Sequence, residues 1–200
     1  MMLPTHALVG LAIAAPLVAF APDLAPAALV GAFVGSLMPD FDLYAGHRRT
    51  LHYPTIYAIA AVPIAIAAVL IATPWLVAAA FLLAGAALHC RMDRYGGGLE
   101  LRPWEGTSDR AVYDHVQRRW RAPKRWIRYD GAPEDLLLAS LAGVPLWMVL
   151  DDPFRWFVGA ALLIGGLYVL LRRRLANAAP VVFDAVPESV DDYVPSRYKQ

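Results

Sequence analysis

Apolar residues in this chain come in long blocks that are separated by short polar turns. Six apolar segments cover approximately residues 3–20, 24–38, 53–73, 74–91, 135–150 and 154–171. A membrane-spanning helix needs about 20 mostly apolar residues, and segment 53–73 fits this requirement best. The first two segments are interrupted by Pro16, Pro22 and Pro26, so a re-entrant hairpin is an alternative to two full crossings. The pattern predicts an all-α integral membrane bundle of about six apolar helices.

Composition and charge support this class and indicate an orientation. The chain is 58% hydrophobic, whereas soluble domains are usually about 45–50% apolar. Its single cysteine, Cys90, excludes a disulfide framework. If the segments cross or return in turn, 18 Lys and Arg residues all lie on the side of the N-terminus, with the exception of Arg155. Because these residues mark the cytoplasmic face, we expect a multi-pass protein of the inner (cytoplasmic) membrane.

The polar regions predict the domain organisation. We expect a helical membrane domain over residues 1–175, a cytoplasmic insertion within it over 92–134, and a flexible cytoplasmic tail over 176–200. In the insertion, Val112, Val116 and Trp120 recur at a spacing of four, which predicts a helix from Ser108 to about Trp120. This helix could lie among lipid headgroups, or the insertion could form a cap over the helix ends.

Four of the five histidines and three aspartates stand where apolar segments end on the cytoplasmic side. They are His6, Asp40, Asp42, His47, His52, His89 and Asp93. His89 and Asp93 have the spacing that puts two side chains on one helix face. Asp40 and Asp42 would point to one side of an extended segment. An ionisable group inside an apolar segment, such as His6, is costly and usually has a partner and a function. We therefore expect these side chains to converge.

The ligand types predict a metal centre. A mixed set of His and Asp suits zinc, with manganese or iron as alternatives. Because seven candidates exceed what one structural ion needs, we expect two divalent ions that share a bridging carboxylate, for which we choose Asp40. Asp42 could be a ligand or the acceptor that fixes a histidine tautomer. His47 could be a ligand or a general acid, and Arg48 is a candidate phosphate clamp. Asp42, His47 and Arg48 are thus the catalytic candidates.

These motifs resemble those of a family of membrane-bound metal-dependent hydrolases that includes LexA-regulated inner-membrane members. The resemblance covers about residues 3–105 and rests on Thr5-His6 with Gly10, Gly35-Ser36-Leu37-Met38-Pro39-Asp40-Phe41-Asp42, His47-Arg48 with His52, and His89 with Asp93. The family is distantly similar to zinc-dependent phospholipase C and P1-type nucleases. The resemblance implies that five residues bind metal: His6, Asp40, His52, His89 and Asp93.

The predicted function is metal-assisted hydrolysis of a phosphoester at the cytoplasmic membrane face. Expected partners are the lipid bilayer and a phosphate-containing lipid, such as a phospholipid, or a small-molecule substrate. The alternative is a non-catalytic membrane protein whose cluster holds a structural metal or relays protons. A transport pathway is disfavoured because the middles of the long segments are not polar. Specific nucleic-acid binding is not expected, since the basic residues of the insertion are interleaved with Asp109 and Asp114.

Overall fold

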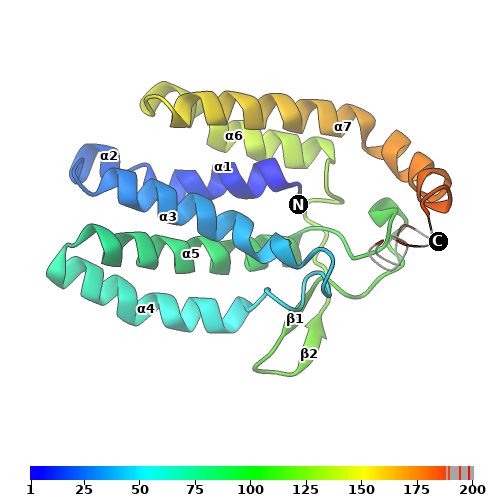
Figure 1. Ribbon diagram of the computed structural model, residues 1–200, viewed down its shortest axis with the longest axis horizontal. Coiled ribbons are helices and arrows are strands. Elements are labelled where there is room, and N and C mark those ends of the chain that lie inside the picture. The colour runs from blue at the N-terminus through cyan, green and yellow to red at the C-terminus, as the bar shows by residue number, and fades with distance from the viewer. Residues whose placement is uncertain (188, 190–193, 195–197, 199–200) are drawn as a thin grey trace.

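A computed structural model of the chain describes residues 1–187, 189, 194 and 198. Its helices are α1 (Leu3–Ala14), α2 (Leu17–Phe20), α3 (Ala25–Leu37), α4 (Pro54–Ile71), α5 (Pro74–Tyr95), α6 (Pro133–Val149) and α7 (Phe154–Asp184). The short elements are the 3-10 helices η1 (Met38–Asp42) and η2 (Pro103–Glu105) and the strands β1 (Val112–Asp114) and β2 (Arg119–Arg121). Figure 1 shows the long helices with their axes roughly aligned, and α1 and α3 lie between the α6–α7 pair and the α4–α5 pair.

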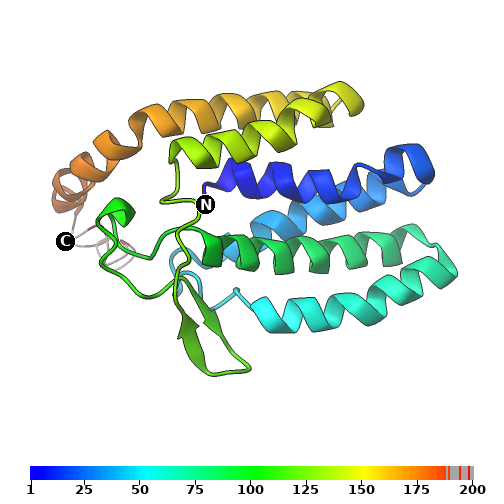
Figure 2. The same cartoon turned by 180° about the vertical axis from the view of Figure 1, so that it is seen from behind.

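Prolines start most of these helices. A proline occupies the first turn of α1, α3, α4, α5 and α6. Proline is favoured at this position because its missing N–H would have no partner within the helix and its φ is already helical. The turn between α4 and α5 and the turn between α6 and α7 lie at one end of the bundle, and the longer connections lie at the other end (Figure 2).

Within the described residues, four helical stretches are long and apolar enough to span a membrane. They are Leu3–Phe20, Pro54–Ile71, Pro74–Tyr95 and Phe154–Asp184. Helix α3 has 13 residues and is therefore about 20 Å long, which is less than the ~30 Å of a bilayer core. All six predicted apolar segments form helices, but α3 is too short to cross alone. The re-entrant arrangement of the first two segments stays a prediction.

The predicted helix from Ser108 to Trp120 is wrong. Strands β1 and β2 pair there as an antiparallel hairpin. The Asp114 carboxylate accepts hydrogen bonds from the N–H groups of Val116 and Gln117, both at 3.0 Å. An acidic side chain that bonds the backbone two or three residues ahead closes a turn and competes with a helix. The fold is thus mainly helical, with one small two-stranded sheet, and is not strictly all-α.

The C-terminal boundary also differs from the prediction. Helix α7 continues to Asp184, past residue 176, where we expected the flexible tail to begin. The segment from 176 to 184 is rich in alanine and valine, and it extends a helix that is already formed. Most of the remaining predicted tail lies outside the described residues.

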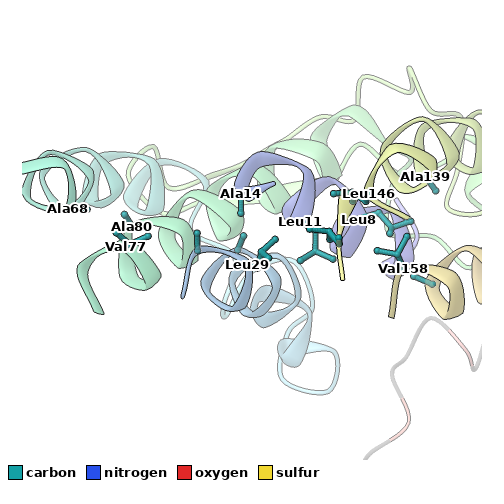
Figure 3. Close-up of a cluster of buried hydrophobic side chains, with 14 of the residues drawn as sticks. Leu8, Leu11, Ala14, Leu29, Ala68, Val77, Ala80, Ala139, Leu146 and Val158 are labelled. Atoms are coloured by element: carbon teal, nitrogen blue, oxygen red, sulfur yellow. The ribbon is translucent and has the colours of Figure 1, made fainter. Parts of the chain in front are cut away.

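The apolar core lies between α1 and its neighbours. Figure 3 shows Leu8 and Leu11 of α1 packed near Leu146 of α6 and Val158 of α7, and all four side chains are buried. Leu8 and Leu11 thus join α1 to the helices around it, and α1 is the central helix of the bundle.

Small residues bring α3 against α5. A Cβ atom on Gly35 of α3 would overlap the backbone of Leu82 in α5, and one on Gly85 would come within 2.7 Å of the Ala32 carbonyl oxygen. The two helices therefore pack with their backbones nearly in contact, as small residues permit in membrane bundles. This close approach sets the position of η1 relative to the last turns of α5.

Candidate metal centre

The seven clustered side chains come from four segments that meet at one end of the bundle. His6 lies on α1, Asp40 and Asp42 on η1, His47 and His52 on the loop before α4, and His89 and Asp93 on α5. In Figure 1 this is the end that carries the N-terminus and the hairpin. The extended segment that we expected at residues 40–42 is instead a 3-10 helix, because Pro39 favours a helical first turn.

Four ligand atoms in this cluster have the spacing of a metal site. Asp40, His52, His89 and Asp93 each offer one atom, and these atoms lie within 4.8 Å of one another. His89 Nε2 lies 3.3 Å from Asp40 Oδ1 and 3.4 Å from Asp93 Oδ2. His52 Nε2 lies 3.7 Å and 3.2 Å from the same two oxygens. Tetrahedral ligands at zinc bond lengths are about 3.3 Å apart, so these four residues could hold a metal ion.

The histidine tautomers agree with this geometry. His89 Nδ1 lies 2.7 Å from the carbonyl oxygen of Ser36, which can only accept a hydrogen bond, so Nδ1 carries a proton. His52 Nδ1 donates in the same way to Asp42 Oδ2 at 2.9 Å. In their neutral forms both rings then direct an Nε2 lone pair at carboxylate oxygens. Lone pairs that face carboxylates are stabilised by a cation between them. Hydrogen bonds from the other ring nitrogen, such as those of Nδ1 here, are the usual way to orient metal-binding imidazoles.

Asp42 organises the loop that carries two of the histidines. Its two oxygens accept hydrogen bonds at 2.9–3.2 Å from His47 Nδ1, His52 Nδ1 and the N–H groups of Arg48, Arg49 and Leu51. Burial by itself would raise the pKa of Asp42, but the hydrogen bonds from His47 and His52 outweigh it and hold the pKa below its usual value. Of the two roles predicted for Asp42, the contacts favour the acceptor that fixes a histidine tautomer.

Electrostatics favour positive charge between the carboxylates. Burial lowers the pKa of His52, yet its hydrogen bonds to Asp42 and Asp93 raise it above the ordinary histidine value. Burial likewise raises the pKa of Asp40, but the hydrogen bond to His89 lowers it overall. Ionised carboxylates favour a positive ion between them, and a metal ion there would replace the proton that His52 otherwise binds.

Asp93 has oxygens that face two different sets of groups. Its Oδ1 lies 3.2 Å from His6 Nε2 and 3.1 Å from the Met1 amino group. Its Oδ2 faces His52 and His89, as described above, and lies 3.4 Å from Arg48 Nε. The His6 ring also stacks on His89 with 3.8 Å between ring centroids. The structure therefore brings all five predicted ligands together, with His6 on the far oxygen of Asp93.

A cavity of about 680 Å³ adjoins the centre. Asp40, His47, Arg48 and Asp93 all contribute to its wall. The His47 side chain is 17% exposed, whereas those of His52 and His89 are fully buried. Arg48 adopts a left-handed backbone conformation (φ 60°), and its Nη1 donates to the Gly97 carbonyl at 3.0 Å. His47 and Arg48 are thus the catalytic candidates that a molecule in the cavity could reach.

Sequence reasoning missed residues that support the centre. The Thr5 hydroxyl donates to Asp135 Oδ1 at 2.7 Å, and the Met2 N–H donates to Asp135 Oδ2 at 2.8 Å. These bonds fix α1, and so His6, against the start of α6. A carboxylate that opens an apolar segment was a usable signal, since such a group needs a partner. The pair of Asp130 with Arg172 of α7 (2.9 Å) gave no local signal.

No family model, curated protein or solved structure matches this chain. The geometry of the centre and its motifs are therefore the grounds for assigning a function.

Proposed function

We propose that the protein is a membrane-embedded, metal-dependent hydrolase of phosphoesters. One observation carries this proposal: four ligand atoms lie within 4.8 Å of one another, and two of the residues that offer them, Asp40 and Asp93, line a cavity. A site that opens on a cavity can admit a substrate, whereas a structural metal site is closed. The resemblance to membrane-bound metal-dependent hydrolases supports the same assignment.

We infer that the centre holds two divalent ions. Asp40, His52, His89 and Asp93 would hold one ion, and His6 with the far oxygen of Asp93 would contribute to a second. Asp93 is better oriented than Asp40 to bridge, because its two oxygens face different histidines. Zinc suits these ligands best, with manganese or iron as alternatives. Such ions activate water and neutralise the charge of a phosphoryl group.

The remaining residues of the cluster have separate roles. His47 lines the cavity, and its Nδ1 donates to Asp42 Oδ1 at 3.1 Å. That bond orients the ring toward a substrate, so His47 is the general acid or base. The Arg48 guanidinium contributes positive charge to the cavity wall and suits phosphate oxygens. Asp42 is a positioning residue, because it is buried and acts through His47 and His52.

The proposal includes a membrane location. Four helical stretches have the length and composition of membrane spans, and the basic residues concentrate at the end of the bundle that holds the centre. Lys and Arg favour the cytoplasmic face, so we infer that the centre faces the cytoplasm. A phospholipid or another lipid-linked phosphate could reach it there, and the lipid bilayer is its main partner.

Elemental analysis of detergent-purified protein tests the proposal. The test variant is the double substitution His89→Gln and Asp93→Asn, which preserves side-chain size while it removes ligands. His115→Gln is the matched control, because His115 lies outside the cluster and bonds the Arg49 carbonyl. We expect about two ions per chain in the unchanged and control proteins, and their loss from the double variant. Hydrolysis of phosphoester substrates should be retained in the control variant and lost in the double variant.

Two outcomes would contradict the proposal. One tightly held ion without phosphoesterase activity would indicate a structural metal. No bound metal after reloading with zinc, manganese and iron would leave a hydrogen-bonded proton relay as the function of the cluster.

A further inference from the structure

The cavity beside the metal centre has a second wall that the proposed hydrolysis does not use. The end near the centre is polar, as described above. The opposite wall is the C-terminal part of α7, which contributes apolar residues. Leu175, Ala179, Val182 and Phe183 lie along this wall. One cavity therefore extends from the polar residues of the centre to the apolar side chains of α7.

Helix α7 is longer than a membrane span requires. Its 31 residues make a helix about 46 Å long, whereas a bilayer core is about 30 Å thick. Arg172, Arg173 and Arg174 are consecutive and suit the level of the lipid headgroups. Residues 175–183 continue the helix beyond them, and Figure 1 shows this part of α7 bending over the end of the bundle that carries the N-terminus.

This extension exposes apolar side chains outside the expected membrane level. Leu175 is 49% exposed and Val182 is 58% exposed. An apolar helix surface in contact with water is unfavourable, and such surfaces usually bind an apolar partner. Because the surface lines the same cavity as Asp40 and His47, a partner bound there would also meet the metal centre.

Arg172 lines the cavity between the two ends, and its charge is paired. Arg172 donates from Nε to Asp130 Oδ2 at 2.9 Å and from Nη2 to Asp130 Oδ1 at 3.1 Å. The Tyr168 hydroxyl donates to the same carboxylate at 2.6 Å. These contacts compensate the charge of Arg172, so the middle of the cavity does not need a counter-ion from a ligand. A hydrocarbon chain can pass this point without burying an unpaired charge.

We propose that residues 175–183 of α7 bind a hydrocarbon chain of the substrate while its phosphate group lies at the metal centre. The occupant is an amphiphile, a lipid or alkyl phosphate that is drawn from the membrane surface. The position of its phosphate rests on the proposed function, and the chain-binding wall is an independent feature of α7. The cavity volume of about 680 Å³ lies within the ~300–1,000 Å³ that is usual for small-molecule sites.

Equilibrium dialysis against the zinc-loaded protein in lipid nanodiscs tests this inference. The ligands are radiolabelled phosphonate analogues of butyl, octyl and dodecyl phosphate, whose P–C bond a phosphoesterase does not cleave, and they are named below by their parent phosphates. Binding to empty nanodiscs is subtracted, and dissociation constants refer to free aqueous ligand. We expect saturable binding that tightens with chain length, by up to about fourfold for each methylene that enters the cavity. Release of inorganic phosphate from the alkyl phosphates themselves is measured in parallel and reports on the proposed function alone.

Substitutions on two faces of α7 locate the chain. Ala179→Trp places an indole in the cavity, and we expect it to weaken dodecyl phosphate binding at least tenfold while butyl phosphate binding stays the same. Val181→Trp is the matched control, because Val181 is 72% exposed and does not contribute to the cavity wall. If Ala179→Trp does not fold, Val182→Trp blocks the same wall.

Each outcome decides the inference separately from the hydrolase proposal. Chain-length dependence that is lost in Ala179→Trp but kept in Val181→Trp supports the inference, even if no phosphate is released. Equal binding of all three alkyl phosphates, equal effects of the two substitutions, or no saturable binding overturns it. Phosphate release in those cases would leave a hydrolase whose substrates are recognised by their phosphate groups.

Discussion

Replacing Asp42 with Asn tests whether the buried carboxylate below the centre orients the metal-binding histidines. Asp42 Oδ1 accepts from His47 Nδ1 and the Arg48 N–H, and Oδ2 accepts from His52 Nδ1 and two N–H groups of the loop. An amide keeps one oxygen and replaces the other with a donor. The less costly orientation places the NH₂ group at Oδ1, where two hydrogen bonds are lost.

The expected magnitudes follow from those contacts. Hydrogen bonds to a charged group contribute about 1.5–3 kcal/mol each, and repacking recovers part of a loss, so Asp42→Asn should lower the free energy of unfolding by roughly 2–4 kcal/mol. The retained oxygen is neutral and orients His52 less firmly. Loss of such an outer contact typically weakens metal binding by about 10–100-fold. The variant should therefore still bind metal, but with lower affinity.

Competition with a chromophoric chelator at neutral pH measures the affinity, and denaturant unfolding in detergent measures the stability. Asp114→Asn is the matched control, because this buried carboxylate also accepts N–H and guanidinium hydrogen bonds but lies in the hairpin. It should cost stability while metal affinity stays within about twofold. Unchanged affinity in Asp42→Asn, or an equal loss in both variants, would refute the role of Asp42.

Three further predictions concern packing, ion count and protons. Gly35→Ala should lower the free energy of unfolding by about 1–3 kcal/mol in denaturant, because the new Cβ atom would overlap Leu82. Gly166→Ala is the control and should be neutral or stabilising, because no atom lies near the place that its Cβ would occupy. In elemental analysis, His6→Gln should lose one of the two proposed ions and keep the other, since His6 faces only Oδ1 of Asp93 among the ligand atoms described. Loss of both ions would contradict the assignment of His6 to a second ion. At limiting metal, occupancy should fall as the pH drops, beginning above ~6.5, because His52 must be deprotonated to bind and its pKa is raised above the ordinary histidine value, and dialysis at a series of pH values checks this.

The convergence of the cluster could be predicted from the sequence because it depends on where apolar segments end. Helices of membrane-spanning length have ends on defined sides, so His6, His52 and His89 are assigned to one side by counting. The hairpin could not be predicted in this way. Three apolar residues at a spacing of four are a weak helix signal, and the turn depends on the Asp114 side chain and on Arg118, whose φ is 52°.

The identity of a bridging carboxylate stays a prediction. Sequence reasoning chose Asp40, whereas the two oxygens of Asp93 face different histidines. Which oxygen faces which histidine depends on how far α3 and α5 slide along each other. Gly35 and Gly85 determine that contact, and its distance cannot be derived from residue types.

The origin of the ligands in four separate segments has a consequence for stability. The apolar core lies along α1 and its neighbours (Figure 3) and contains none of the clustered residues. Metal binding and local folding are coupled when ligands come from different elements. Removal of the proposed metal should therefore loosen η1, the loop before α4 and the last turn of α5, because their carboxylates would lose a counter-ion and their imidazoles a shared binding partner. The apolar packing of α1 against α6 and α7 would remain, since it depends on Leu8, Leu11 and their neighbours and not on charge.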